Sequence, residues 1–554
     1  MGNNKFTVWQ RFMGLIKLEK KDFLQILYYA IFAGLVNLSV PLGIQAIVNL
    51  IQGARISTSW IVLVTLVTLG VAFVGILQLM QIRILENIQQ KIFTRASFEF
   101  AYRFPKIKMS ELKHFYPPEL ANRFFDVLTI QKGISKLVLD FPAAVLQIIF
   151  GLILLSLYHP FFILYGVLLV SLIYLVFKFT ARAGLNTSIE ESKMKYRIAH
   201  WIQEVARTLI SFKIAGKTKH AITKNDALVS KYLDARESHF QILRLQFIQM
   251  IVFKVLVTAG LLIIGGLLVL NQQMNIGQFV AAEIIILLII SSVEKMIIGL
   301  ENFYDLLTSL EKLGEVVDKE LETQGGDKSF AENSELRIEL KNVSFVGNNR
   351  KMILKDINLT INPGDKILLE GVNGSGKSTL LKIIAGLLEP TSGTIYVNGI
   401  SLENIDLNFY HSLLGQSITE ESPFEGTLLE NITFGDDSIT QKEIYTALER
   451  TGLKDFVRQQ ADGLGTIIFP EGIRLPHTIA KKIVLARSLV RNPGLLILND
   501  PLHQIDKDEQ QRIVDFLFDP INKWSIIVIS NDEIWSKHCN RHLVINDGQI
   551  QNKT

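Results

Sequence analysis

The residues whose types and spacing carry the clearest chemistry lie between positions 371 and 379. The segment reads Gly371, Val372, Asn373, Gly374, Ser375, Gly376, Lys377, Ser378 and Thr379. Glycines at this spacing let backbone N–H groups close around phosphate oxygens, and a helix N-terminus after them favours negative charge. Lys377 is placed to reach the β- and γ-phosphates, and the Ser378 hydroxyl to hold Mg²⁺. The pattern therefore predicts the phosphate-binding loop of a nucleotide site.

A loop of this kind needs a strand before it and a helix after it. An apolar run, 366–370, precedes the loop, and a helical pattern, 380–385, follows it. Further short strands are expected at 336–340, 395–397, 495–498, 525–529 and 542–545. Residues 336–554 are therefore predicted to form a soluble α/β P-loop ATPase domain.

The first 300 residues have a different character, because they contain six long apolar stretches. In a chain that is 49% hydrophobic, stretches near ~20 residues are long enough to cross a bilayer as helices. They lie at about 23–48, 60–82, 139–158, 161–180, 250–270 and 276–296. The sequence predicts a six-helix transmembrane domain over 23–318, with the first stretch retained as a membrane anchor.

Two long polar segments, 83–138 and 181–249, separate these stretches and are rich in Lys and Arg. By the positive-inside rule they are cytoplasmic, together with both termini. Apolar residues recur in them at helical spacing, which favours spans that continue as two helical hairpins into the cytoplasm. Ordinary cytoplasmic loops are the alternative, although unstructured loops of that length are uncommon.

The ends of the membrane domain have their own signals. Residues 1–22 are expected to form an amphipathic helix on the inner surface, with a frayed tail as the alternative. Polar residues 319–335, with Gly325 and Gly326, are predicted to be a linker. The single cysteine, Cys539, rules out an internal disulfide.

Six spans with long cytoplasmic hairpins, a linker and a P-loop domain, in this order, resemble an ABC exporter half-transporter. The resemblance covers nearly the whole chain. Supporting segments are Gly426–Ile432, which is similar to the family's GTxxENI stretch, and Asp547-Gly548. It implies that the chain binds ATP and Mg²⁺, that Gln416 is the Q-loop residue contacting Mg²⁺, and that Asp506 is the D-loop aspartate.

The chain departs from the family pattern at five nucleotide-handling positions. Gly347 stands where the family has an adenine-stacking aromatic residue, and Asn531 where it has the switch histidine. Asn499 and Asp500 stand where the family has Asp and Glu, so the carboxylate at 500 is one methylene shorter than a glutamate base. The signature LSGGQ is replaced by Leu475, Pro476, His477, Thr478 and Ile479. We therefore expect ATP binding with weak or no hydrolysis.

The family works as a head-to-tail dimer in which each nucleotide lies between one subunit's P-loop and the other's signature. The departures therefore favour a heterodimer with a fuller half-transporter, with a homodimer as the alternative. The resemblance to type I secretion and bacteriocin exporters implies a peptide, protein or amphipathic cargo crossing the inner membrane. A periplasmic adaptor is a further candidate partner, and no nucleic acid is expected. The competing interpretation is a non-transporting pseudo-ATPase that scaffolds or regulates a membrane complex through ATP binding.

The sixth apolar stretch contains charged residues, of which Glu283 lies well inside it. An intramembrane carboxylate is a candidate for a functional site by default. The alternative is that Glu283 forms an ion pair with a neighbouring cation near the interface.

Overall fold

A computed structural model describes residues 6–52, 58–113, 115–322, 325–326, 335–347, 350–418 and 421–552. Side chains of Leu172, 175–177 and Asn552 are outside this description. The chain divides into two compact units. The first comprises residues 1–105 and 115–319, and the second 106–114 and 320–554. Most of the predicted linker, 319–335, falls outside the described residues.

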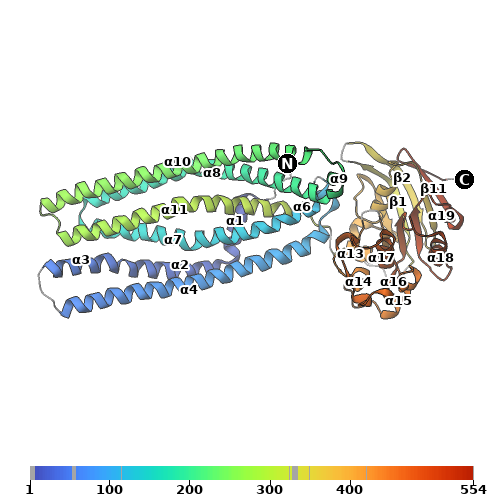
Figure 1. Cartoon of the computed structure of the whole chain (residues 1–554), viewed down its shortest axis with the longest axis horizontal. Helices are drawn as coiled ribbons and strands as arrows, with labels where there is room; N and C mark the ends of the chain where they lie inside the picture. The colour runs from blue at the N-terminus through green and yellow to red at the C-terminus, as the bar shows by residue number, and fades with distance from the viewer. Residues whose placement is uncertain are drawn as a thin grey trace. The chain divides into compact units, whose positions relative to one another are not determined.

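Helices build the first unit, and the longest of them run side by side (Figure 1). Its helices are α1 (Val8–Leu18), α2 (Lys20–Asn37), α3 (Ser39–Gln52), α4 (Thr58–Arg103), α6 (Pro117–Ala121), α7 (Asp126–Tyr158), α8 (Phe161–Arg207), α9 (Leu209–Ile214), α10 (His220–Leu270) and α11 (Ile276–Val317). Helices α4, α8 and α10 are 46, 47 and 51 residues long. The polar segments therefore continue the apolar spans as helices, as the hairpin prediction requires.

Five helical stretches among the described residues are long and apolar enough to cross a membrane. They are Lys20–Gln52, Thr58–Lys106, Pro117–Tyr158, His220–Leu270 and Ile276–Val317. The fourth predicted span, 161–180, falls on α8, where the apolar helical stretch within the description is Phe161–Ser171. A count of six spans stays a prediction.

The first span is a single helix in the prediction but two helices in the structure. The break falls at Leu38, between α2 and α3. Pro41 lies one turn further on, inside α3. Its ring and its missing N–H remove a helical hydrogen bond to the preceding turn, which accounts for a break at this place.

Helix α1 is held on α11 rather than frayed. Phe12 is buried and lies 5.7 Å, between ring centroids, from Phe303. The Arg11 guanidinium pairs with Glu311 at 2.9 Å and also with Asp318. These aromatic and ionic contacts hold α1 against the C-terminal part of α11.

Helices α7 and α11 pack closely, because small residues let their backbones approach. At Gly133 on α7, a Cβ atom would lie 2.8 Å from Leu306 Cβ and 3.2 Å from the Asn302 carbonyl oxygen. At Gly151 it would lie 3.0 Å from Ile289. Larger residues at these positions would force the helices apart.

The second unit is an α/β domain with an antiparallel sheet and a mainly parallel sheet. The first sheet has the order β2-β1-β4-β5, and the second has the order β12-β11-β3-β10-β9-β6. The strands are β1 (Ile338–Val346), β2 (Met352–Ile361), β3 (Lys366–Glu370), β4 (Ser392–Val397), β5 (Ile400–Ser401), β6 (Leu414–Ser417), β7 (Gly426–Thr427), β8 (Ile467–Ile468), β9 (Leu495–Asn499), β10 (Ser525–Ile529), β11 (Arg541–Asn546) and β12 (Gln549–Asn552). These strands, together with the helices between them, confirm the predicted α/β domain.

The helices of this unit are α5 (Met109–Leu112), α12 (Lys377–Ile384), α13 (Leu407–Ser412), α14 (Leu428–Thr433), α15 (Gln441–Arg450), α16 (Lys454–Gln459), α17 (His477–Leu489), α18 (Lys507–Leu517) and α19 (Glu533–His538). Strands β3, β10 and β9 lie adjacent and parallel in the centre of the larger sheet. Since parallel strands end at one edge, the loops after β3, β9 and β10 meet there, which places the candidate site.

Candidate nucleotide-binding site

The phosphate-binding loop connects β3 to α12, as its sequence predicts. Its glycines take left-handed backbone angles, with φ of +144° at Gly371, +82° at Gly374 and +108° at Gly376. A Cβ atom at Gly376 would lie 2.8 Å from Leu354 Cδ2 and 3.0 Å from the Ile353 carbonyl oxygen. Glycine is required there both for the backbone angle and for the close approach of β2.

Two polar side chains of the loop are suited to phosphate. The Lys377 ammonium donates to the carbonyl oxygens of Gly371 at 2.7 Å and Val372 at 2.9 Å, so it folds back over the loop. Burial lowers the pKa of Lys377. The Ser375 hydroxyl oxygen is buried and forms no hydrogen bond with the described residues. Phosphate oxygens would satisfy both groups, so the loop fits a nucleotide.

A cavity of about 590 Å³ opens beside the loop. It is lined by Lys351, Met352, Ile353, residues 373–379, Asn499, Asp500, Ile529, Ser530, Asn531, Asp547 and Gly548. The structure therefore brings together the loop and three of the candidate positions, Asn499, Asp500 and Asn531. The Asn499 amide nitrogen lies 3.5 Å from the Ser378 hydroxyl oxygen.

The position of Asp500 is fixed by neighbours from other elements. Its backbone has φ of +48°, and its N–H donates to the Ile529 carbonyl at 2.8 Å. Its carboxylate accepts a hydrogen bond from Ser530 Oγ at 3.2 Å and lies 3.6 Å from His503 Nδ1. The carboxylate is thus held by the ends of β9 and β10.

Several neighbours of the site carry no signal in the sequence. Lys351 and Met352 line the cavity at the start of β2, and no local motif marks them. Ser530 and His503 contact Asp500, but only the pairing of β10 with β9 brings Ser530 there. Such contacts are tertiary and leave no signal in sequence spacing.

Other sequence candidates lie outside the lining of this cavity, as far as the described residues show. Gln416 is on β6, paired in register with Ile497 of β9, two positions before Asn499. Asp506 occupies the N-cap position of α18, but its side chain forms no capping hydrogen bond with the described residues. The segment 475–479 enters α17 at Pro476, and Leu475 packs against the core around α14 and α15. These roles remain predictions.

The position of Gly347, where the family pattern predicts an aromatic residue, is crowded. Its N–H donates to the Lys351 carbonyl oxygen at 2.9 Å. A Cβ atom would lie 2.6 Å from Ile353 Cδ1, so a larger residue would displace that side chain. Met352, with 47% of its surface exposed, lines the cavity and offers apolar area in place of a ring.

The cavity offers oxygen ligands for Mg²⁺, but the two nearest the loop are uncharged. Mg²⁺ is usually bound by one or two carboxylates together with substrate phosphates and water. Here Ser378 and Asn499 would supply a hydroxyl and an amide oxygen, both uncharged. The residues fit a magnesium ion that arrives with the nucleotide and keeps phosphate oxygens among its ligands.

The membrane candidate Glu283 lies half-buried on α11. Among the described residues it forms no ion pair within 4.0 Å. Glu294, one of the other charges on this helix, is paired with Lys254 of α10 at 3.8 Å. The functional role of Glu283 stays a prediction.

The pKa of Lys377 predicts how nucleotide affinity changes with pH. Because burial lowers this pKa, the ammonium is lost at a lower pH than in an exposed lysine, and ATP affinity should fall as pH rises through that range. Phosphate favours the charged form, so binding there should be accompanied by proton uptake. Calorimetric titration with an ATP analogue at pH 7 and 9.5, in buffers of different ionisation enthalpy, measures both effects. Lys377→Arg should remove the dependence, and an unchanged dependence in that variant would contradict the assignment.

Gly376→Ala should weaken nucleotide binding by at least about 10-fold and lower the melting temperature by several degrees, because the added Cβ would collide with Leu354 and Ile353 of β2. This collision adds to the strain of the positive φ, which costs ~1–3 kcal/mol. Gly374→Ala is the matched control, because its φ is also positive but nothing lies within 4 Å of the added Cβ. Isothermal titration and thermal melts measure the two changes. Equal losses in both variants would show that contact with β2 is not what fixes the loop.

Comparison with known proteins agrees with this geometry. The family model for the ABC transporter transmembrane region matches residues 23–293, and the model for the ABC transporter domain matches residues 354–503. A structure of a bacterial Atm1-family ABC exporter with ATP bound covers 96% of this chain and 95% of its own, with a TM-score of 0.84. At 15% identity, this likeness shows the fold alone.

Curated relatives are similar over about half of the chain. The alpha-hemolysin translocation ATP-binding protein HlyB of Escherichia coli O157:H7 is 29% identical over 306 residues, 55% of this chain and 43% of that protein. The ATP-dependent lipid A-core flippase of Burkholderia orbicola is 28% identical over 281 residues, which are 50% of this chain and 47% of that protein. The ATP-dependent permease MDL1 of Candida albicans is 32% identical over 304 residues, which are 52% of this chain and 43% of that protein. The alignments therefore span less than half the length of each relative.

Both halves of the chain thus match ABC transporter models, in the order that the fold requires. The first unit is helical and contains several apolar helices of membrane-spanning length. The second contains the phosphate-binding loop and its cavity. The chain belongs to the ABC transporters and contains an ABC transporter transmembrane region followed by an ABC transporter domain.

Proposed function

We propose that this chain is the ATP-binding, weakly or non-hydrolytic half of a dimeric exporter. It would bind ATP at the loop 371–379 and move with its partner as the partner's site turns over. The observation that carries the proposal is the composition of one cavity. It combines a well-formed phosphate-binding loop with amides at Asn499 and Asn531 and the short carboxylate of Asp500.

The chemistry of these side chains limits hydrolysis. An amide at Asn499 cannot supply the negative charge that the family uses to hold Mg²⁺, and an amide at Asn531 cannot supply a cation to the γ-phosphate. The Asp500 carboxylate is engaged by Ser530 at 3.2 Å, and aspartate is shorter than the glutamate it replaces. A displacement of ~1 Å can cost ~10²-fold in rate. Binding would survive these changes, because the loop and Lys377 do not depend on them.

The altered signature segment, 475–479, supports a heterodimer. In the family the signature of one subunit completes the site of the other. Pro476 lacks a backbone N–H and a hydroxyl, and His477 and Thr478 place side chains where the family has glycine. A homodimer would then have two defective sites, so we infer a partner half-transporter that supplies an intact signature.

The cargo is inferred from the names of relatives, and the location from the Lys- and Arg-rich segments of the chain. One relative is named for translocation of alpha-hemolysin and another as a lipid A-core flippase. These names support a peptide, protein or amphipathic cargo. The chain would lie in the inner membrane, with its ATP-binding domain and both termini on the cytoplasmic side and a periplasmic adaptor as a further partner.

The proposal is tested by measuring export and assembly separately. Lys377→Ala should abolish export by the complex, while the variant should still co-purify with its partner from membranes. The matched variant Lys382→Ala, on the same helix but outside the cavity lining, should export normally. Continued export by Lys377→Ala would favour a pseudo-ATPase that scaffolds or regulates the complex instead.

A further inference from the structure

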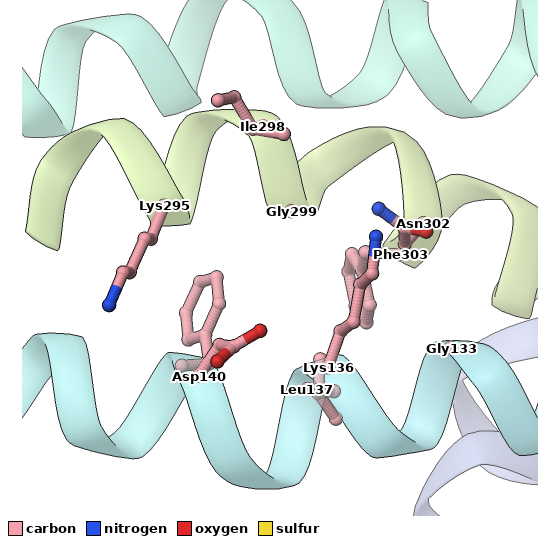
Figure 2. A pocket seen from close by; sticks show the side chains of 10 residues that line it. Gly133, Lys136, Leu137, Asp140, Lys295, Ile298, Gly299, Asn302 and Phe303 are labelled. Carbon is pink, nitrogen blue, oxygen red and sulfur yellow. The ribbon is translucent and has the colours of Figure 1, made fainter. Parts of the chain in front are cut away.

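A second cavity lies in the first unit, between α7 and α11. Its volume is about 130 Å³. It is lined by Gly133, Lys136, Leu137, Asp140, Phe141, Lys295, Ile298, Gly299, Asn302 and Phe303. Figure 2 shows Lys136 reaching from α7 towards α11, and Lys295 reaching from α11 towards α7. Lysine side chains from two different helices therefore line the same cavity.

The charge of this cavity is not balanced. Asp140 lies between the two lysines (Figure 2), so the lining carries two positive charges and one negative charge. Within the described residues, neither Lys136 nor Lys295 lies within 4.0 Å of a carboxylate oxygen. By contrast, the neighbouring Glu294 is neutralised by Lys254. The excess positive charge is therefore available to an anion.

The position of the lysines along the helices is also informative. At a ~1.5 Å rise per residue, Lys295 lies about 28 Å from the start of α11 and Lys136 about 33 Å from the end of α7. A hydrocarbon core is about 30 Å thick. In the orientation proposed above, both lysines lie at the cytoplasmic edge of the bilayer, where charged groups keep access to water.

A larger cavity of about 280 Å³ adjoins the first, because Lys295 lines both. Residues such as Ser291 and Gln147 place it nearer the other end of the same two helices. Its lining is mixed, with amide and hydroxyl groups beside apolar side chains such as Leu38, Val74 and Ile285. It suits a portion of a ligand that carries both apolar surface and hydrogen-bonding groups.

We propose that Lys136 and Lys295 bind the acidic head group, a carboxylate or a phosphate, of an amphipathic cargo whose less polar part occupies the adjoining cavity. The inference rests on the proposed export function, since it specifies the cargo of that function. Charged side chains that line a cavity between membrane helices are candidates for a substrate path. Two lysines beside a single aspartate leave a net positive charge in the lining, and a bound anion would balance it.

The test uses the full chain in phosphatidylcholine nanodiscs, with empty nanodiscs subtracted. Radiolabelled N-lauroylglycine supplies one carboxylate, and N-lauroylglycinamide is its uncharged match. Dodecyl phosphate supplies the phosphate arm, and N-acetylglycine carries the acid without the acyl chain. The wild-type chain should bind at least one acidic amphiphile at least about 10-fold more tightly than the amide or N-acetylglycine. The arm that discriminates identifies the head group.

Lysine variants distinguish binding of the acid at this site from nonspecific attraction of anions to the positively charged chain. Lys136→Gln and Lys295→Gln should each lose about 10-fold, the double variant should not distinguish acid from amide, and Lys295→Arg should retain the preference. Lys254→Gln, which makes the same chemical change on α10, should leave it unchanged. Equal affinity of the wild type for acid and amide, or an unchanged preference in the double variant, would overturn the proposal.

The outcomes also distinguish this proposal from the proposed function. Fluorescent ATP analogue binding at the loop 371–379 is measured in the same nanodiscs and should be unaffected in the double variant. Export that depends on Lys377, without any preference for an anion, would overturn the cargo site alone. Anion binding at the lysines, with export indifferent to Lys377→Ala, would overturn the export function and leave the site standing.

Discussion

Lys377→Ala should lower the affinity of the chain for ATP by at least about 100-fold. The ammonium is the charged group that the loop offers to the β- and γ-phosphates, and hydrogen bonds to charged groups contribute ~1.5–3 kcal/mol each. Its present partners are two carbonyl oxygens at 2.7 and 2.9 Å, which a nucleotide would replace or share. Titration of the purified chain with a fluorescent ATP analogue measures the change.

The control for this variant is Lys382→Ala, which makes the same substitution later on α12. Its affinity should lie within about twofold of the wild type, and the thermal stability of both variants should show that the domain stays folded. Undiminished affinity in Lys377→Ala would place the nucleotide elsewhere and would remove the assignment of the 590 Å³ cavity.

Restoring the family residues should raise ATP hydrolysis only when both halves of a site are restored. The first set is Asn499→Asp, Asp500→Glu and Asn531→His, and the second is Pro476→Ser, His477→Gly and Thr478→Gly. In a dimer of this chain alone, each site needs both sets, so the combined variant should turn over at least ~10²-fold faster than the wild type. Either set alone should produce a small gain, because groups that act together are not additive.

Phosphate release under saturating ATP, at matched protein concentration, measures these rates. Lys377→Ala added to the combined variant is the control, and it should return the rate to background. A full gain from the first set alone would show that segment 475–479 is a competent signature. Robust turnover by the wild-type chain, sensitive to Lys377→Ala, would contradict the account of both sets.

The nucleotide site was predictable from sequence wherever one short segment builds it. The loop 371–379 contains its own glycines, its lysine and its flanking strand and helix, so local spacing is sufficient. The predicted strands after which Asn499 and Asn531 fall also specify those positions, because parallel strands end at one edge of a sheet. The contact of Asp500 with Ser530 depends on the pairing of β10 with β9, which spacing does not contain.

The membrane domain shows the same limit. The periodicity of the polar segments predicts helical hairpins, and α4, α8 and α10 are long helices that bear this out. The break at Leu38 was missed, although Pro41 signals it. Lys136 and Lys295 line one cavity because α7 packs on α11 at Gly133, which joins residues far apart in the chain.

The proposed function requires that this chain hold ATP with little or no hydrolysis. The most direct measurement incubates the purified chain with ATP labelled at both the α- and γ-phosphates, removes free nucleotide, and determines what remains bound after many minutes. The account predicts bound ATP with both labels in equal amounts, and loss of both in Lys377→Ala. Bound ADP that has lost the γ-label, formed by the wild type and absent in Lys377→Ala, would contradict it.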